Sequence, residues 1–125
     1  MKKAVIIPEG GVKPLAPYSP AIKINQFIFT SGQIGIDPDT GKLVPWGVKA
    51  ETRQALINLK SILQAAGSSL EKTVKVTVYV KDIQDYGLVN EVYSEFFQEA
   101  PPARSIIQGK LPANAYVEFD AVAFE

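Results

Sequence analysis

An arginine lies inside a short segment that otherwise has the pattern of an apolar β-strand. The segment is PPARSII, residues 101–107, and Arg104 is its charged residue. Because removing a guanidinium from water costs more than apolar neighbours return, a buried arginine needs an anionic partner. The planar fork of arginine suits a carboxylate, which it holds through two parallel hydrogen bonds. We therefore expect a carboxylate beside Arg104, supplied by the protein or by a ligand.

Glu118 is the candidate partner within the protein. We expect the last two strands at about Ala103–Gln108 and Ala115–Phe124. If they form an antiparallel hairpin whose paired residue numbers sum to an even value, Arg104 and Glu118 share a face. A buried ion pair often costs as much free energy as it returns, so burial alone is weak evidence for a stabilising role. A structural ion pair and a ligand-binding arginine both remain open at this point.

The composition excludes several classes of catalytic site. The chain has no cysteine and no histidine, which removes disulfides, cysteine nucleophiles, serine–histidine dyads and the zinc nucleobase deaminases. The Asp37–Gly41 turn resembles a calcium loop but lacks its third acidic position and distant glutamate, so we predict no metal site. The chemistry must use arginine, lysine, carboxylates, tyrosine, serine, asparagine, backbone groups and water.

Length and charge narrow the class of protein further. The 125 residues fit a single domain, residues 1–125. The 13 basic and 13 acidic residues cancel, so the chain lacks the positive field on which a nonspecific nucleic-acid binder relies. Only the short apolar run Ala4–Ile7 precedes Pro8, which is too short for a signal peptide or a membrane span. We therefore expect a cytoplasmic protein that binds neither membranes nor nucleic acid.

The hydrophobic periodicity predicts strands, a helix, a strand, a second helix and two final strands. Strand pairs are expected in residues 21–34 around a turn at Asn25, a helix over Val48–Ala66 closed by Gly67, and a strand over Thr73–Val80. In that strand Val74, Val76, Val78 and Val80 are predicted to face the core. Asp85 is expected to cap the second helix, which carries the apolar stripe Val89, Tyr93, Phe96 and Phe97.

This order of elements predicts an α+β sheet with both helices on one face. The strands alternate apolar residues with threonine, tyrosine and phenylalanine and have no fully charged row. We therefore expect the second face of the sheet to pack against partner subunits.

Other positions carry groups that could meet a ligand. Ser31 and Gly32 follow a predicted strand and could present a hydroxyl and backbone N–H donors, although a plain turn is the simpler interpretation. Tyr18 lies between prolines in PYSP, residues 17–20, where it could form a rigid aromatic lid or simply pack. Asn90 lies near the start of the second helix, where an exposed polar residue is ordinary. None of these positions is decisive by itself.

Together, the motifs resemble the RidA/YjgF family of small imine and enamine deaminases, formerly labelled endoribonuclease L-PSP. The similar segments occur in the family's order along nearly the whole chain. They are APYSP (16–20), FTSGQI (29–34), GKLV (41–44), ETRQAL (51–56), NL (58–59), VNEVY (89–93), PARS (102–105) and VE (117–118).

The resemblance implies a chorismate-mutase-like single domain, with a mixed β-sheet and two helices on one face. It also implies a homotrimer with clefts between subunits. Arg104 would bind the substrate carboxylate, and Glu118 would orient or deprotonate the attacking water. The remaining pocket residues would be Tyr18, Ser31, Gly32, Asn90 and, through its backbone carbonyl, Ile106.

The implied reaction is hydrolysis of 2-iminopropanoate, 2-iminobutanoate and 2-aminoacrylate to 2-keto acids and ammonia, without a cofactor. The family's activity is linked to pyridoxal-phosphate-dependent dehydratases and to the removal of damaging metabolites. The alternative is a trimer that binds carboxylates or 2-keto acids without turnover, as a regulatory or chaperone-like module. An endoribonuclease is the weakest alternative, because histidine and a basic stripe are missing.

Departures from the family pattern bear on substrate choice. Trp46 stands where glycine is common, and Glu51 stands where glutamine is common. The segment Arg104–Leu111 is a residue shorter than in well-known members, which would change a local bulge after the arginine.

Overall fold

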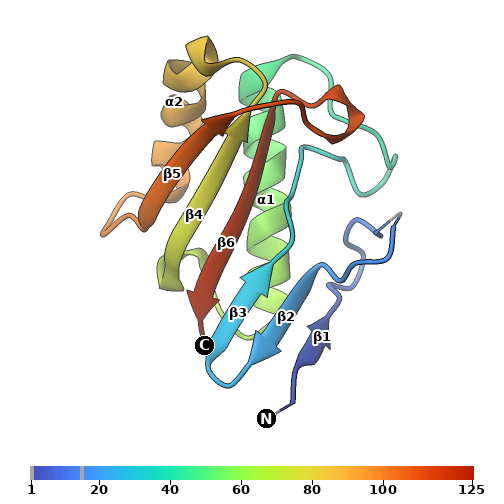
Figure 1. Ribbon diagram of the computed structural model, residues 1–125. Coiled ribbons are helices and arrows are strands. Elements are labelled where there is room, and N and C mark those ends of the chain that lie inside the picture. Colours follow the sequence, from blue (N-terminus) through green and yellow to red (C-terminus); the bar gives the residue numbers. More distant parts are fainter. Residues whose placement is uncertain (1, 15) are drawn as a thin grey trace.

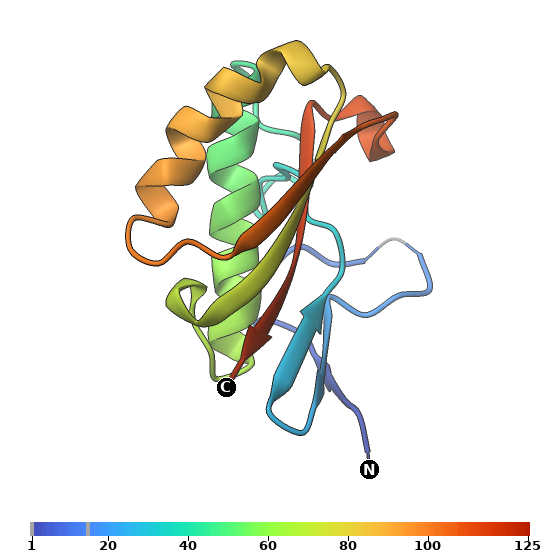
Figure 2. The same cartoon turned by 60° about the vertical axis from the view of Figure 1, so that its left-hand side comes forward.

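A six-stranded mixed sheet in the order β1-β2-β3-β6-β4-β5 forms the frame of the molecule (Figure 1). The computed structural model describes residues 2–14 and 16–125. Both helices cover one face of the sheet, as Figure 2 shows from the side. The elements are β1 (Ala4–Ile6), β2 (Ala21–Ile24), β3 (Phe27–Thr30), α1 (Val48–Ala65), η1 (Leu70–Lys72), β4 (Thr73–Val80), η2 (Ile83–Asp85), α2 (Tyr86–Phe96), β5 (Ala103–Gln108), η3 (Pro112–Asn114) and β6 (Val117–Phe124). The predicted mixed sheet with two helices is confirmed.

Strands β2 and β3 form the predicted hairpin, which turns at Asn25 with a positive φ of 52°. Strand β1 pairs antiparallel with β2 and was not predicted, because its three residues are too few to show a period. No helix within the described ranges is both long and apolar enough to cross a membrane.

Helix α1 ends where the sequence predicts. Gly67 adopts a φ of 82°, which favours glycine. Its N–H donates to the carbonyl of Gln64 at 3.0 Å, and the N–H of Ser68 donates to the carbonyl of Leu63 at 2.8 Å. These two bonds are those of a Schellman motif, which satisfies the last carbonyls of the helix.

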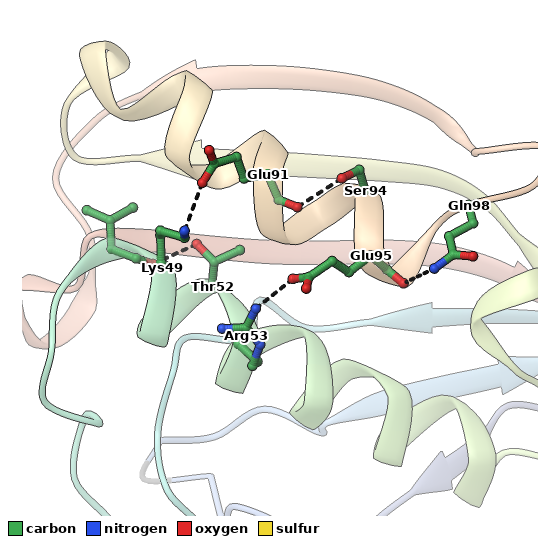
Figure 3. Close-up of polar contacts among 8 residues, drawn as sticks. Lys49, Thr52, Arg53, Glu91, Ser94, Glu95 and Gln98 are labelled. Atoms are coloured by element: carbon green, nitrogen blue, oxygen red, sulfur yellow. Dashed lines mark hydrogen bonds and ion pairs between the residues drawn. The ribbon is translucent and has the colours of Figure 1, made fainter.

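Helix α2 begins differently from the prediction. Asp85 occupies the position before the helix but makes no side-chain capping bond. Asp82 makes a capping bond one turn earlier: its carboxylate accepts a hydrogen bond from the N–H of Gln84 at 2.9 Å, at the start of η2. Two ion pairs connect α2 to α1, Lys49–Glu91 at 2.8 Å and Arg53–Glu95 at 2.6 Å (Figure 3). Because these pairs are exposed, each contributes little free energy.

One of the four valines of β4 that were predicted to face the core is exposed. Val76, Val78 and Val80 are fully buried as expected, whereas Val74 is 42% exposed. The register with β6 shifts between Thr73 and Lys75, so Val74 is an extra residue and Thr73 is buried instead. A β-bulge therefore reverses the alternation at the start of the strand.

The last two strands do not form the hairpin that the Arg104–Glu118 pairing required. Strand β4 lies between β5 and β6, pairing parallel with β5 and antiparallel with β6. A parallel pair needs a crossover, which α2 supplies, so the chain returns to the free edge of β4 to add β6. The β4–β5 ladder keeps one register from Lys75↔Ala103 to Val80↔Gln108, so no bulge follows Arg104 within β5.

The sheet face opposite the helices carries large apolar side chains. Phe27, Phe29 and Phe124 are 48%, 47% and 41% exposed, while Ile28 between the first two is fully buried under the helices. An apolar face of this kind is characteristic of an interaction surface. Burial of this face by partner subunits stays a prediction.

Gly35 provides a test of how the 34–36 segment packs on α1. A Cβ atom at Gly35 would lie 2.7 Å from the carbonyl oxygen and 2.8 Å from the Cα of Glu51. Since helical backbone cannot move aside cheaply, Gly35→Ala should lower the free energy of unfolding by about 1–3 kcal/mol. Urea unfolding measures this, with Gly109→Ala as the control because a Cβ there meets nothing within 4 Å. Equal stabilities would contradict the close approach.

Candidate active site

Arg104 lies on β5 and points toward α2. Its register partner on β4 is Val76, which is fully buried on the helix side of the sheet. The guanidinium carbon lies 4.8 Å from the ring centroid of Tyr93 and 5.5 Å from that of Tyr86. Nη1 donates to Oδ1 of Asn90 at 2.9 Å, and Nη2 donates to the hydroxyl of Tyr86 at 3.3 Å. The side chain is half-buried between aromatic rings.

Helix α2 supplies all three of these partners. Tyr86, Asn90 and Tyr93 are spaced four and three residues apart, which puts them on one face of the helix. Among these three, Asn90 is a predicted pocket residue and Tyr93 a predicted core residue, whereas the sequence pattern does not single out Tyr86. Their shared helical face, opposite a charged strand residue, is the signal that could have found all three.

The charge of Arg104 has no carboxylate partner in the described part of the chain. The ion pairs there are Lys23–Glu125, Lys49–Glu91 and Arg53–Glu95. Both hydrogen bonds of Arg104 go to neutral side chains, and a guanidinium has five N–H donors. The anion expected beside Arg104 is therefore not supplied by this chain's described residues, and donors remain for a ligand.

Glu118 lies on the other face of the sheet. Its register partner on β4 is Tyr79, and the register partner of Arg104 on β4 is Val76. Val76 and Tyr79 are an odd number of residues apart, so their side chains point to opposite faces of the sheet. The Arg104–Glu118 pairing, which was expected only if the last two strands formed a hairpin, therefore does not form within this chain, because β4 separates the two strands and the side chains point in opposite directions. Burial, followed by the negative charge of Asp120, raises the pKa of the Glu118 carboxyl.

Gly32 lies directly against Glu118. A Cβ atom at Gly32 would lie 2.6 Å from Oε2 of Glu118, so only glycine leaves room for the carboxylate in this position. The approach follows from an irregularity between β3 and β6. Thr30 Oγ1 accepts from the N–H of Ala121 at 3.0 Å, and Gln33 exchanges backbone bonds with Phe119 at 2.7 and 3.0 Å. Residues 30–33 thus oppose one residue fewer on β6, as in a bulge.

Ser31 holds the loop that carries Tyr18. The Ser31 hydroxyl donates to the carbonyl of Ser19 at 2.6 Å, and its N–H donates to the carbonyl of Pro20 at 2.9 Å. Its hydroxyl proton is therefore used within the chain. Tyr18 is 51% exposed and, with Gly32, lines a cavity of about 450 Å³. A larger hollow of about 610 Å³, lined by Arg53, Lys60, Glu71 and Glu95 among others, contains none of the predicted residues.

The predicted residues thus form two separate groups within one chain. The arginine group consists of Asn90 and Arg104, with Ile106 on the same face, where it packs against the core. The glutamate group consists of Tyr18, Ser31, Gly32 and Glu118. Within residues 2–14 and 16–125, no three acidic side chains gather in a way that could hold a metal ion. The chemistry open to these groups is carboxylate binding and proton transfer.

Tyr93 allows the contribution of its buried hydroxyl to stability to be tested apart from that of its ring. Tyr93 is 7% exposed, and no described residue bonds to its buried hydroxyl. Burial raises its pKa to about 12, against the opposing effect of Arg104. Tyr93→Phe removes an unsatisfied polar group and should raise the free energy of unfolding by about 1 kcal/mol. Tyr93→Leu is the control, because it also removes the ring whose centroid lies 4.6 Å from that of Phe97, and it should destabilise the fold. Destabilisation by Tyr93→Phe in thermal unfolding would mean that the hydroxyl has a bonding partner.

Comparison with known proteins places the chain among close relatives. The family model described as Endoribonuclease L-PSP matches residues 10–125. A RutC family protein of Pyrococcus abyssi is 48% identical over 126 residues, covering 100% of this chain and 99% of the relative. The 2-iminobutanoate/2-iminopropanoate deaminase of Mus musculus is 46% identical over 112 residues, covering 89% of this chain and 83% of the relative.

The fold is shared as well. The crystal structure of YyfA from Yersinia pestis, a protein of unknown function of the Rid family, superposes with a TM-score of 0.94. It is 37% identical, and the match covers 99% of this chain and 100% of the other. The likeness therefore includes every element that carries a candidate site residue.

Proposed function

Because the chain belongs to the RidA/YjgF family, whose matching model is described as Endoribonuclease L-PSP, we propose that it hydrolyses 2-imino acids and their enamine tautomers. The products are 2-keto acids and ammonia, and the substrates include 2-iminopropanoate, 2-iminobutanoate and 2-aminoacrylate. One observation carries the proposal. The Arg104 guanidinium is half-buried, is oriented by neutral side chains and has no carboxylate partner among the described residues. The name of the mouse relative supports the reaction.

Arg104 binds the substrate carboxylate in this proposal. Two parallel hydrogen bonds fix the carboxylate and offset its charge, which leaves the neighbouring C=N carbon open to attack. Asn90 and the rings of Tyr86 and Tyr93 hold the guanidinium in one orientation. Arg104 therefore acts by placement and by charge.

Glu118 moves the protons. Its carboxylate takes a proton from water as the water oxygen bonds to the imine carbon and the C=N π pair moves to the nitrogen, and the protonated carboxyl then gives that proton to the nitrogen. The carboxylate next takes the proton of the carbinol hydroxyl and passes it to the nitrogen, so the carbon–nitrogen bond breaks, ammonia leaves with the bonding pair, and the carbinol oxygen becomes the keto oxygen. The raised pKa of Glu118 brings it closer to neutral pH, where a group exchanges protons most effectively. Acid–base assistance of this kind contributes about 10²- to 10⁴-fold to the rate.

The complete site takes the arginine group from one subunit and the glutamate group from the next. The opposite orientations of Arg104 and Glu118 support this arrangement, because one chain does not bring them together. A homotrimer with clefts between subunits would join the two groups. It would also cover the exposed Phe27 and Phe29 on the open face of the sheet.

The test follows the decay of an imine that an amino-acid oxidase or a serine/threonine dehydratase releases. The protein should accelerate this decay, and Arg104→Ala should abolish the acceleration while the protein remains folded. Arg53→Ala is the matched control, because Arg53 forms an exposed ion pair with Glu95 on the helices. Full activity of Arg104→Ala would rule out the assigned role. Saturable 2-keto-acid binding in calorimetry, without accelerated decay, would favour a binding module instead.

A further inference from the structure

The cavity beside Gly32 is large and mostly apolar. It measures about 450 Å³, and its walls include Ile34, Ile36 and Pro112. Lys13 is its one charged lining residue in the described part of the chain. For scale, an apolar cavity of about 150 Å³ is large enough to bind benzene. A methyl side chain would leave most of this space to water in contact with apolar walls.

One residue, Gly32, connects the cavity to the carboxylate of Glu118. Gly32 lines the cavity, and its missing Cβ is the space that the Glu118 carboxylate approaches. The imine carbon of a substrate is planar and has three substituents. When the carboxylate points to Arg104 and water approaches from Glu118, the side chain must leave in another direction. The cavity lies along the wall that Gly32 shares with Glu118, so it can receive that side chain.

The walls of the cavity are held in place before any ligand binds. The Nδ2 of the buried Asn58 donates to the carbonyls of both Ile34, at 3.2 Å, and Ile36, at 2.8 Å. Gln54 orients this amide by donating to its Oδ1 at 2.9 Å. The lining also includes Ala113, whose φ of 55° is unfavourable for alanine. Backbone strain retained at a cavity wall points to a functional constraint.

Resting on the function proposed above, we propose that this cavity selects 2-imino acids with bulky apolar side chains, such as those derived from leucine and phenylalanine. A preformed apolar pocket binds a ligand more tightly the more apolar area the ligand buries, and no binding energy is spent on ordering the pocket walls. The wild-type protein should therefore hydrolyse the leucine- and phenylalanine-derived imines with kcat/KM values about tenfold or more above that for 2-iminopropanoate.

Two cavity variants test this selection. Ala16 lines the cavity with an exposed side chain, so Ala16→Phe adds a ring there without disturbing the core. It should lower the ratio of kcat/KM for the phenylalanine-derived imine to that for 2-iminopropanoate by about tenfold. Ile36→Thr makes the wall polar and should lower the same ratio, which provides a second reading if Ala16→Phe folds poorly. Ala65→Phe, at an exposed position on α1 outside the cavity, is the matched control.

The assay uses an amino-acid oxidase to release imines from alanine, leucine, phenylalanine and glutamate. Arg104-dependent decay that is fastest for the bulky apolar imines, with a ratio that both variants lower, is the expected result. Equal or faster hydrolysis of 2-iminopropanoate would overturn the selection while leaving the deaminase activity intact. Fastest hydrolysis of the glutamate-derived imine would overturn it in favour of recognition by Lys13. No acceleration of any imine would overturn both the proposed function and the selection.

Discussion

Mixing two inactive variants, Arg104→Ala and Glu118→Gln, should restore imine hydrolysis to about a quarter of the wild-type activity per site. Each variant alone should be inactive, because every site in it lacks the same group. In a ring of randomly mixed subunits, a site takes its arginine from one subunit and its glutamate from the next. The chance that both are intact is about one half for each group, hence about one quarter for the pair.

The register of the sheet motivates this experiment. Arg104 is level with Val76 and Ala121, both buried under the helices, whereas Glu118 is level with Tyr79 on the other face. No change of side-chain rotamer carries a residue through a paired sheet. If both groups act on one substrate, they come from different chains.

The measurement compares the unmixed variants with a sample in which they are unfolded together, refolded and checked for mixed oligomers by native mass spectrometry. The control mixes Arg104→Ala with the double variant Arg104→Ala/Glu118→Gln, which contains no intact arginine and should remain inactive. Absence of recovery in a sample that contains mixed oligomers would contradict a site shared between chains.

Local patterns in the sequence predict the elements well because those elements are locally determined. The α1 stripe, the Gly67 stop and the turn at Asn25 each depend on residues within a few positions of one another. The prediction that Val74 is buried is wrong for a non-local reason, because the bulge that exposes Val74 depends on how Thr73 and Lys75 pair with β6. Alternation alone cannot locate an extra residue in a ladder.

The order of the strands could not be read from the same patterns. Even numbers for Arg104 and Glu118 imply a shared face only if their strands pair directly, and β4 inserts its own register between them. Two adjacent segments of strand-like sequence look the same whether they form a hairpin or lie on either side of a third strand. The parallel pairing of β4 with β5 depends on how α2 packs, which is a property of the whole fold.

For the site, the sequence could predict that Arg104 needs a binding partner, but not which residues surround it. The chemistry of a buried guanidinium predicts an anionic partner for Arg104, yet the described residues supply neutral ones, Asn90 and two tyrosine rings. Ser31 contacts the loop that carries Tyr18, but its hydroxyl proton is donated to the Ser19 carbonyl and not left free for a ligand. Hydrogen-bond direction depends on loop geometry that spacing does not contain.

Glu118→Gln should lower kcat by about 10²- to 10⁴-fold and leave the affinity for the substrate carboxylate little changed. The amide keeps the shape of the side chain but cannot take a proton from water. Arg104 lies on the other face of the same sheet, so its hydrogen bonds to Asn90 and Tyr86 are untouched. A large rise in KM would instead indicate that Glu118 contributes mainly to binding.

The same variant has a predicted pH signature. Burial first, and then Asp120, raise the pKa of Glu118 above its ordinary value of 4.5, and a base must be deprotonated to act. The wild-type kcat/KM should therefore rise with pH through that raised pKa, and Glu118→Gln should abolish this limb of the profile. Asp120→Asn removes the second cause and should move the limb to lower pH. Asp39→Asn, in an exposed turn, is the matched control.

Stability separates this functional assignment from a structural one. Because the folded pKa of Glu118 is raised, the folded state binds a proton more tightly than the unfolded state. The free energy of unfolding contributed by this group therefore falls as pH rises from the ordinary pKa to the raised one, and the charged carboxylate destabilises the fold at neutral pH. Glu118→Gln should then be at least as stable as the wild type near pH 7, as measured by urea unfolding. A variant that loses activity without losing stability identifies a carboxylate kept for its chemistry, whereas a parallel loss of both would assign Glu118 to the fold.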